Sequence, residues 1–289
     1  MTRSVSICIA NYNMADTIRE SLDSVVEHIP SEYELVIVDE SDDGSREIID
    51  ELDVENSVKK MYVDELGLSR SRNLAVEEAS GDIVITHVDM DDWYDSRYFE
   101  PFVELYVRIR EARKGRDFFF SCPNFSITSN GAYLERYKLK DLPIGPGERD
   151  YRWRAITADD YIRVEVDDDV SGRLKLSDRK TITSRATRSF NHIEGLFSIG
   201  YSTRRILDEE VFGHFGRDFP YYSKIYKLAI LPIAFLTSQF KQDIESPVPR
   251  DGDSLASEID RRTYTVSELQ DRYDIEETMK INKLLDLDE

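Results

Sequence analysis

Three carboxylates follow an apolar strand pattern in the first third of the chain. Residues 83–88 read Ile-Val-Ile-Thr-His-Val, and Asp89, Asp91 and Asp92 occupy three of the next four positions. A buried sheet does not hold unpaired carboxylates, so these side chains are predicted where the strand emerges at its carboxyl end. Hard cations such as Mg²⁺ or Mn²⁺ prefer such oxygen ligands, commonly together with substrate phosphates. An ordinary acidic turn gives the same pattern, because turns favour Asp.

Polar residues follow two earlier strand patterns in the same way. Residues 5–10 lead into Asn11, and residues 34–38 lead into Asp39 and Glu40. The carboxyl ends of parallel strands meet at one edge of an open α/β sheet, which is where such sheets bind ligands. Three strand ends of the same character therefore predict a combined metal and nucleotide site.

A helix predicted to start at Gly67 brings Arg70 and Arg72 to the same edge. Amides at a helix start and guanidinium groups both suit anionic oxygens. The alternative is that one arginine faces solvent and the other pairs with a surface acid. The sequence lacks the Gly-x-Gly-x-x-Gly and Gly-Lys-Ser/Thr patterns, which removes the main support for Rossmann and P-loop sites.

Strand and helix patterns alternate over the first hundred residues. This spacing predicts right-handed crossovers and an α/β fold with a mainly parallel central sheet flanked by helices. Asn130-Gly131, between two strand-like segments, predicts a hairpin turn and with it a small antiparallel addition.

Four blocks of the first half together resemble the nucleotide-binding half of a family 2 glycosyltransferase with the GT-A fold. They are residues 6–13, 36–45, 67–73, and 79–82 running into 89–93. The resemblance implies that Asp91 ligates a divalent ion and that Asp89 faces the ribose or the metal. The family often has Asp at the position of Glu40, so the nucleotide identity stays open. The remaining residues implied to contact the nucleotide are Ala10, Tyr12, Asp39 or Glu40, and Arg70 or Arg72.

A Gly/Pro loop in the second half leads into Glu148, Arg149 and Asp150. This segment resembles in part the acceptor motif of the family, Gly-Glu-Asp-x-Asp, whose carboxylate serves as the base. Arg149 replaces its second acid. Asp150 or Glu148 is the candidate base, and the alternative is that either side chain caps the helix predicted from residue 151.

The composition limits the partners and the location. A formal charge of -20 and a pI near 4.7 argue against nucleic-acid binding and fit a halophilic archaeon. Two cysteines, Cys8 and Cys122, and no secretory pattern predict reduced thiols in a cytoplasmic protein. The apolar run 228–236 is too short to span a bilayer. It follows a basic and aromatic segment, 185–227, and is either a core helix or a contact with the inner face of the membrane.

The sequence therefore predicts an inverting glycosyltransferase that depends on Mn²⁺ or Mg²⁺. It would move a sugar from a nucleoside-diphosphate donor to a hydroxyl of a glycan or lipid-linked acceptor. The alternative is a non-catalytic protein that binds sugar nucleotides or glycans. Residues 1–115 are expected to bind the donor, 116–240 to bind the acceptor within the same domain, and 241–289 to form a linker and helical tail.

Overall fold

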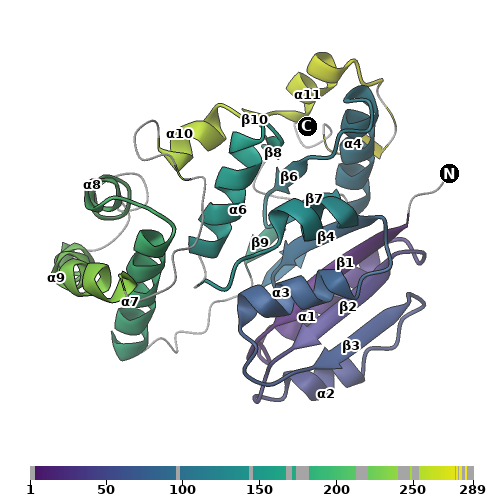
Figure 1. The fold of residues 1–289 in the computed structure, drawn as a ribbon. Coiled ribbons are helices and arrows are strands. Elements are labelled where there is room, and N and C mark those ends of the chain that lie inside the picture. The colour runs from purple at the N-terminus through teal and green to yellow at the C-terminus, as the bar shows by residue number, and fades with distance from the viewer. Residues whose placement is uncertain are drawn as a thin grey trace. The chain divides into compact units, whose positions relative to one another are not determined.

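A computed structural model describes most of the chain (Figure 1). By their internal contacts the residues form two compact units, and the chain crosses between them four times. Unit 1 comprises residues 1–138, 160–176 and 262–289, and unit 2 comprises 139–159 and 177–261. The predicted limits at residues 115 and 240 concern which ligand each half binds, and they stay a prediction. The described residues are 4–95, 98–142, 146–166, 171–173, 182–212, 221–239, 248, 254–276, 278, 280–281 and 284.

Unit 1 is built on an eight-stranded sheet in the order β10-β8-β6-β7-β4-β1-β2-β3. Every neighbouring pair is parallel except the two that involve β7. A separate antiparallel pair joins β5 (Asp92–Tyr94) to β9 (Ser171–Arg173). The mainly parallel sheet with a small antiparallel addition is therefore confirmed. The strands of the main sheet are β1 Val5–Asn11, β2 Glu34–Asp39, β3 Val58–Tyr62, β4 Ile83–Val88, β6 Phe119–Cys122, β7 Phe125–Ser129, β8 Tyr161–Val164 and β10 Thr263–Tyr264.

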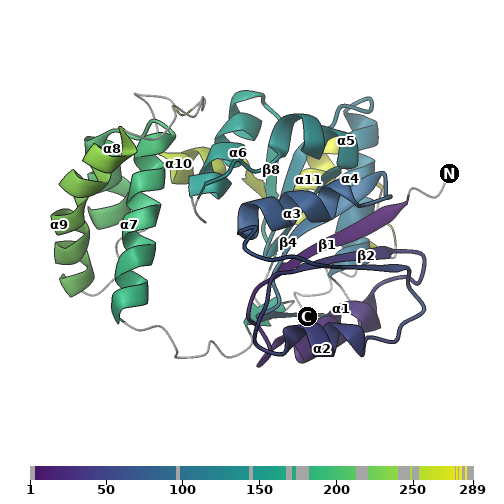
Figure 2. The same cartoon turned by 60° about the horizontal axis from the view of Figure 1, so that its bottom comes forward.

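Helices cover both faces of this sheet (Figure 2). On one face, apolar side chains of α1, α4 and α11 join a single core with alternate strand residues such as Ile7, Ile37 and Ile85. On the other face lies α3, where the Cys8 thiol donates a hydrogen bond to the carbonyl oxygen of Ala75 over 3.5 Å. Both cysteines are buried and reduced. The helices of unit 1 are α1 Ile18–His28, α2 Ser45–Asp50, α3 Leu68–Glu77, α4 Phe99–Ala112, α5 Asn130–Ala132, the π-helix η1 Tyr133–Tyr137, and α11 Val266–Tyr273.

The predicted hairpin at Asn130-Gly131 is wrong. The hydroxyl of Ser129 accepts a hydrogen bond from the amide of Ala132, so Asn130 begins α5, which continues into η1. The antiparallel hairpin lies earlier, between β6 and β7, where Asn124 takes a left-handed φ of 52°. Asn adopts this conformation more readily than most residues, which is what a tight turn requires.

Unit 2 is helical in its described part. Helices α7 and α9 pack on one another, and the rings of Phe197 and Phe235 meet edge to face at 5.2 Å. Helix α6 begins at Pro146, earlier than the sequence indicated, because proline is well suited to the first helical position. The described helices are α6 Pro146–Thr157, α7 Ile182–Ser198, α8 Thr203–Ile206, the π-helix η3 Leu207–Phe212, α9 Tyr221–Ser238 and α10 Leu255–Asp260.

Candidate nucleotide and metal site

The adjacent strands β4, β1 and β2 end at one edge of the sheet, and their polar residues converge there. Asn11 and Asp39 are direct partners across the β1–β2 pair. The side-chain amide of Asn11 donates hydrogen bonds to Asp39 Oδ1 over 2.7 Å and to Ser41 Oγ over 3.0 Å. The first two strand ends therefore form one hydrogen-bonded unit.

A β-bulge shapes the end of β4. Ile85 pairs with Ile7 and Val88 pairs with Ile9, so Thr86 and His87 together face the single residue between them on β1. His87 takes a left-handed φ of 65°. An extra residue in one strand resets the alternation of side chains beyond it. Val88 consequently joins the same core as Ile85, and the following residue, Asp89, points to the opposite face of the sheet.

Asp89 meets Arg72 of α3 on that opposite face. Arg72 Nη2 lies 2.8 Å from Asp89 Oδ1, and the Arg72 side chain is 8% exposed while that of Asp89 is 44% exposed. Arg70, two residues earlier on the helix, is exposed to solvent. Arg72, one of the two predicted arginines, is thus held at the carboxylate turn.

Hydroxyl groups hold the turn in place from the other side. Thr17 and Ser21, at the start of α1, donate hydrogen bonds to the carbonyl oxygens of Met90 over 2.7 Å and Asp89 over 3.4 Å. The hydroxyl of Tyr94 donates to the carbonyl of Asp89 over 3.2 Å and accepts from its amide over 3.1 Å. Burial, with the charges of the nearby acids, raises the pKa of Tyr94, so this hydroxyl stays protonated.

The three carboxylates form a cluster that suits a hard cation. Asp89, Asp91 and Asp92 each offer an oxygen, and these oxygens all lie within 4.8 Å of one another. Asp92 is buried and Asp89 is paired with Arg72, while Asp91 is half-buried. One or two carboxylates are enough for a Mg²⁺ or Mn²⁺ that also takes phosphate oxygens. The donor set therefore fits a divalent ion, with Asp91 as the most available ligand.

The acids that follow β2 are engaged within the protein. Asp39 is completely buried, with Arg46 Nε 3.3 Å from its Oδ2 and the Ser41 hydroxyl 2.7 Å from its Oδ1. Glu40 accepts the amide of Gly67 at both oxygens, over 2.9 and 3.0 Å, and so caps the start of α3. The sequence analysis missed Arg46 and Ser41. The available signal was that residues with hydrogen-bonding side chains follow the end of β2.

The first strand supplies the accessible surface of this edge. Tyr12 directly follows β1 and is 58% exposed, more than most of the aromatic side chains whose burial the structure describes. Ala10 lies within β1 and is buried, with 9% of its surface exposed. An exposed ring beside a carboxylate cluster is a suitable surface for a nucleoside base to stack on.

The two candidate bases of unit 2 differ in their surroundings. Asp150 is completely buried, with Lys140 Nζ 3.1 Å from its Oδ1 and Arg154 Nε 2.9 Å from its Oδ2. Glu148 lies in the first turn of α6 and is only half-buried. Asp150 therefore fastens α6 internally, while Glu148 is the more accessible carboxylate.

Arg149, between them, belongs to a buried network of charges. Its guanidinium binds Glu209 over 3.1 Å and also binds Glu210, both from the π-helix η3. Lys227 of α9 donates to the carbonyl oxygen of Glu210 over 3.0 Å. His192 Nε2 lies 3.2 Å from Glu210 Oε2. The network connects α6, α7, η3 and α9, so the residue that replaces an acid of the resembled motif has a structural role.

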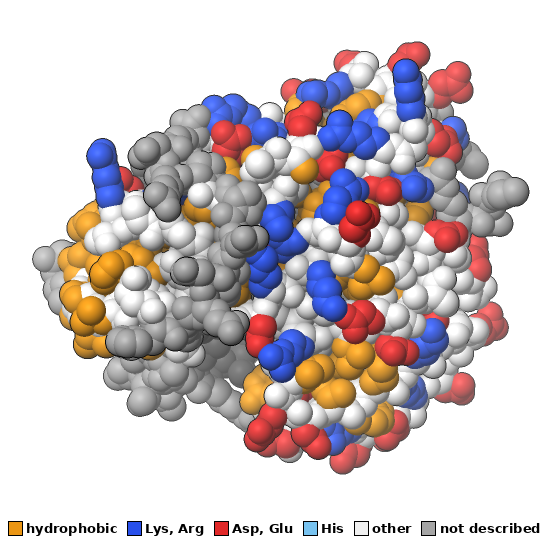
Figure 3. Space-filling view, viewed as in Figure 1, with side chains coloured by type: hydrophobic (Ala, Val, Ile, Leu, Met, Phe, Trp, Pro, Cys, Tyr) orange, Lys and Arg blue, Asp and Glu red, His pale blue; other side chains and the backbone are white. Residues whose placement is uncertain are grey.

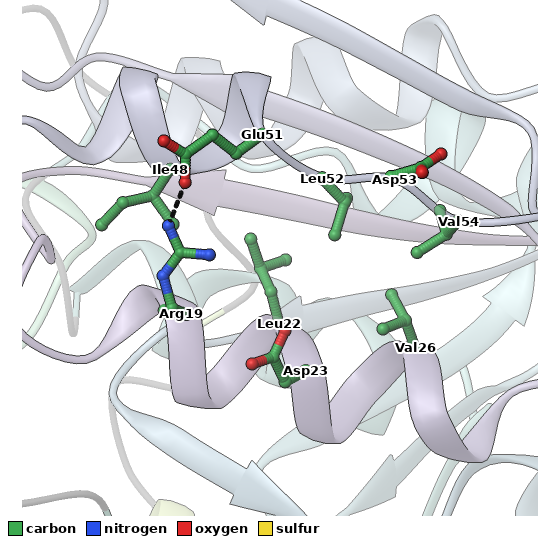
Figure 4. A pocket seen from close by; sticks show the side chains of 9 residues that line it. All are labelled: Arg19, Leu22, Asp23, Val26, Ile48, Glu51, Leu52, Asp53 and Val54. Carbon is green, nitrogen blue, oxygen red and sulfur yellow. Dashed lines mark hydrogen bonds and ion pairs between the residues drawn. The ribbon is translucent and has the colours of Figure 1, made fainter.

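The pocket drawn in Figure 4 lies elsewhere in unit 1, between α1 and the α2 segment. Its volume is about 230 Å³, and Arg19 and Glu51 form an ion pair at its rim. Leu22, Val26 and Leu52 form an apolar part of its wall. None of the predicted site residues lines it, so it is separate from the carboxylate edge.

Residues 6–146 match the family described as Glycosyl transferase family 2. The chain carries a glycosyl transferase family 2 domain. The match begins in β1 and includes all four blocks that carry the resemblance. The family 2 domain therefore contains the whole carboxylate edge.

Curated relatives of this domain are glycosyltransferases by name. Glycosyltransferase GlyA of Streptococcus pneumoniae is 33% identical over 109 residues, which cover 37% of this chain and 15% of the relative. Putative teichuronic acid biosynthesis glycosyltransferase TuaG of Bacillus subtilis is 28% identical over 137 residues, covering 46% of this chain and 51% of the relative. The matched residues of this chain thus cover 15% of the first relative and about half of the second.

Solved structures with some likeness include a mannosyltransferase and TarS. Mannosyltransferase PcManGT from Pyrobaculum calidifontis, in complex with GDP-Man and Mn²⁺, has 15% identity and a TM-score of 0.49 over 100% of this chain and 86% of that one. TarS 1–349 of S. aureus, in complex with UDP-GlcNAc, has 17% identity and a TM-score of 0.48 over 82% of this chain and 72% of that one.

Because His87 lies in the bulge with a left-handed backbone, we expect two substitutions of His87 to differ in stability. Glycine adopts the observed φ of 65° without strain, whereas valine is β-branched and disfavours it. Both lose the imidazole, so they form a matched pair. We expect the free energy of unfolding of His87→Val to be lower than that of His87→Gly by roughly 1–2 kcal/mol. Chemical denaturation measures it, and equal stability of the two variants would contradict the bulge.

We expect unit 2 to lose stability at acid pH, because the ionised carboxylate of Glu210 is stabilised in the fold. Burial alone would raise its pKa, but the His192 hydrogen bond and the charge of Arg149 outweigh burial and lower it from 4.5 to about 2. A carboxylate with a lowered folded pKa stabilises the fold above its unfolded pKa and loses that contribution below it. The loss is therefore expected as the pH falls from 4.5 towards about 2.

Fluorescence of the buried Trp153 measures this dependence once Trp93, the second tryptophan, is replaced by phenylalanine. Against this background, Glu210→Gln should lower the free energy of unfolding at neutral pH by roughly 1–3 kcal/mol. The difference from the parent should shrink at low pH. A difference that is constant with pH would show that the ionised carboxylate of Glu210 does not stabilise unit 2.

Proposed function

We propose that the protein is an inverting glycosyltransferase that moves a sugar from a nucleoside-diphosphate donor to an acceptor hydroxyl and depends on a divalent ion. The observation that carries the proposal is the carboxylate turn after β4, fixed against Arg72 within a family 2 domain. Other residues of the same sheet edge, above all the exposed Tyr12, give a nucleoside a surface to bind.

On the donor side, Asp91 would hold the ion, with Asp89 as a second ligand or as a contact to the ribose. A divalent ion bound there supplies positive charge to the diphosphate leaving group. Arg72 neutralises part of the acidic cluster and adds a donor for phosphate oxygens. Asp39 and Glu40 support this surface from within, since their carboxylates are already hydrogen-bonded to the protein.

On the acceptor side, a carboxylate would take the proton from the attacking hydroxyl. We assign this role to Glu148, because Asp150 is buried and paired at both oxygens. A base needs an accessible oxygen within hydrogen-bond reach of the proton that it accepts. Asp150 then acts as the residue that fixes the start of α6.

The proposal has three finer parts. The acidity suits the cytoplasm of a halophilic organism. A glycan or a lipid-linked carrier is the proposed acceptor, and Mn²⁺ or Mg²⁺ is the proposed ion. Nucleotide sugars can be screened in high salt for the donor that most raises the melting temperature, because a ligand that binds only the folded state stabilises it.

Replacing Asp91 tests the donor site. Asp91→Asn removes a ligand charge and should weaken Mn²⁺-dependent binding of the donor by at least tenfold, as titration calorimetry measures it. Asp82→Asn is the matched control, because Asp82 is an exposed acid at the opposite end of the same strand. Binding that is unchanged in Asp91→Asn, or equally reduced in the control, would refute the metal assignment.

Replacing the two acceptor-side acids tests the base. Glu148→Gln should lower kcat for sugar transfer or donor hydrolysis by about 10²–10⁴-fold while donor binding stays intact. Asp150→Asn should lower chiefly the stability of the fold, because it weakens two partly buried ion pairs of a completely buried carboxylate. Full turnover in Glu148→Gln together with a folded but inactive Asp150→Asn would reverse the two roles.

A non-catalytic sugar-nucleotide or glycan-binding protein is the second candidate. It is favoured by Arg149, which stands in place of an acid and lies in a buried network. Donor binding that requires a divalent ion, without turnover of any donor in the parent protein, would support it.

A further inference from the structure

The pocket between α1 and the segment that follows α2, here called the α1–α2 pocket, has apolar walls. Figure 4 shows Leu22 and Val26 of α1 facing Leu52 and Val54 across it. A cavity of about 150 Å³ can hold a benzene molecule, whereas pockets for drug-sized ligands usually measure about 300 Å³ or more. The volume of the α1–α2 pocket, about 230 Å³, therefore suits one large apolar side chain of a partner.

The charged residues that line the α1–α2 pocket are mainly acidic. Asp23, Glu51 and Asp53 bring three negative charges, against the single positive charge of Arg19. All three acids are exposed. Arg19 pairs with Glu51, and among the described residues no cation pairs with Asp23 or Asp53. The rim of the pocket is therefore complementary to a ligand that carries positive charge next to an apolar group.

The acidic surface extends beyond the pocket. Residues 47–55 contain five acids and no Lys or Arg, and all five acids are exposed. Lys60 of β3 contacts this segment at the carbonyl oxygen of Asp50, over 3.3 Å, so the acids remain in excess. Figure 3 shows several acidic side chains along the lower margin of unit 1, where α2 lies. A negative surface larger than the pocket favours a polypeptide with several positive charges over a small cation.

The ion pair at the rim does not exclude such a ligand. The side chains of Arg19 and Glu51 are 54 and 65% exposed. An exposed ion pair of this kind contributes little to stability, because water screens it and both side chains lose freedom when they pair. A Lys or Arg of a partner can therefore take the place of Arg19 at the carboxylate of Glu51.

We propose that the α1–α2 pocket binds a basic segment of a partner protein. The segment inserts one apolar side chain between Leu22 and Leu52, and its Lys or Arg side chains meet the acids of the rim. A second copy of the chain is a less suitable occupant, because each copy carries a net charge of -20. The pocket shares no residue with the proposed transfer site, so this binding and the transfer reaction can fail independently.

Fluorescence anisotropy of a dye-labelled synthetic peptide tests the binding with the full chain, at the lowest salt concentration at which circular dichroism shows it folded. The probe has one leucine with two lysines on each side, and a second peptide has alanine in place of the leucine. The parent should bind the leucine peptide roughly tenfold more tightly than the alanine peptide, because the pocket buries the larger side chain. Added salt should weaken the binding of both peptides.

Two variants separate the pocket from its charge. Val54→Phe fills the pocket and keeps its charge, so it should bind both peptides equally. Leu134→Phe is its control, because Leu134 is exposed in unit 1 and does not line the pocket. Asp53→Asn should weaken binding of the leucine peptide by roughly twofold to fivefold. Asp82→Asn, the same change at an exposed acid outside the pocket, should leave that binding nearly unchanged.

Equal affinity of the parent for the two peptides would overturn the proposal, because general attraction between opposite charges would then explain the binding. A preference for leucine that Val54→Phe retains would overturn it as well. So would a dimer in light scattering that Val54→Phe dissociates, because a second copy would then occupy the pocket.

Discussion

The carboxylate edge of unit 1 depends on one constraint, which is that Asp89 must leave a buried strand on the side of Arg72. The bulge at His87 satisfies it by placing two residues opposite one on β1. Val88 then stays in the core, and Asp89 reaches the guanidinium at 2.8 Å. A regular strand would exchange these two side chains and bury a carboxylate among apolar residues, at a cost of several kcal/mol.

The rest of the edge is arranged so that few of its acids are left to a ligand. Asp39 is enclosed by Arg46, Ser41 and Asn11, and Glu40 caps α3. Internal hydrogen bonds of this kind orient a surface before a ligand arrives, which reduces the ordering that binding requires. Asp91 remains as the accessible carboxylate of a turn whose carbonyls are held by hydroxyl groups.

Unit 2 separates its charges from its apolar surface in an unusual way. Arg149, Glu209, Glu210 and Lys227 are buried, while Ile233 and Leu236 of α9 are exposed. Breaking a buried pair leaves an uncompensated charge, so the network commits α6, η3 and α9 to one arrangement.

The sequence by itself determined the alternation of strands and helices, the parallel core and the collection of polar residues after three strands. These follow from side-chain periodicity and from strand ends meeting at one edge, which are local properties. Only the tertiary structure decided that Arg72 meets Asp89, that Asp150 is enclosed by Lys140 and Arg154, and that Asn130 begins a helix instead of a turn. These outcomes depend on a left-handed residue inside a strand and on partners distant in the chain. The local sequence pattern shows neither the left-handed residue nor the distant partners.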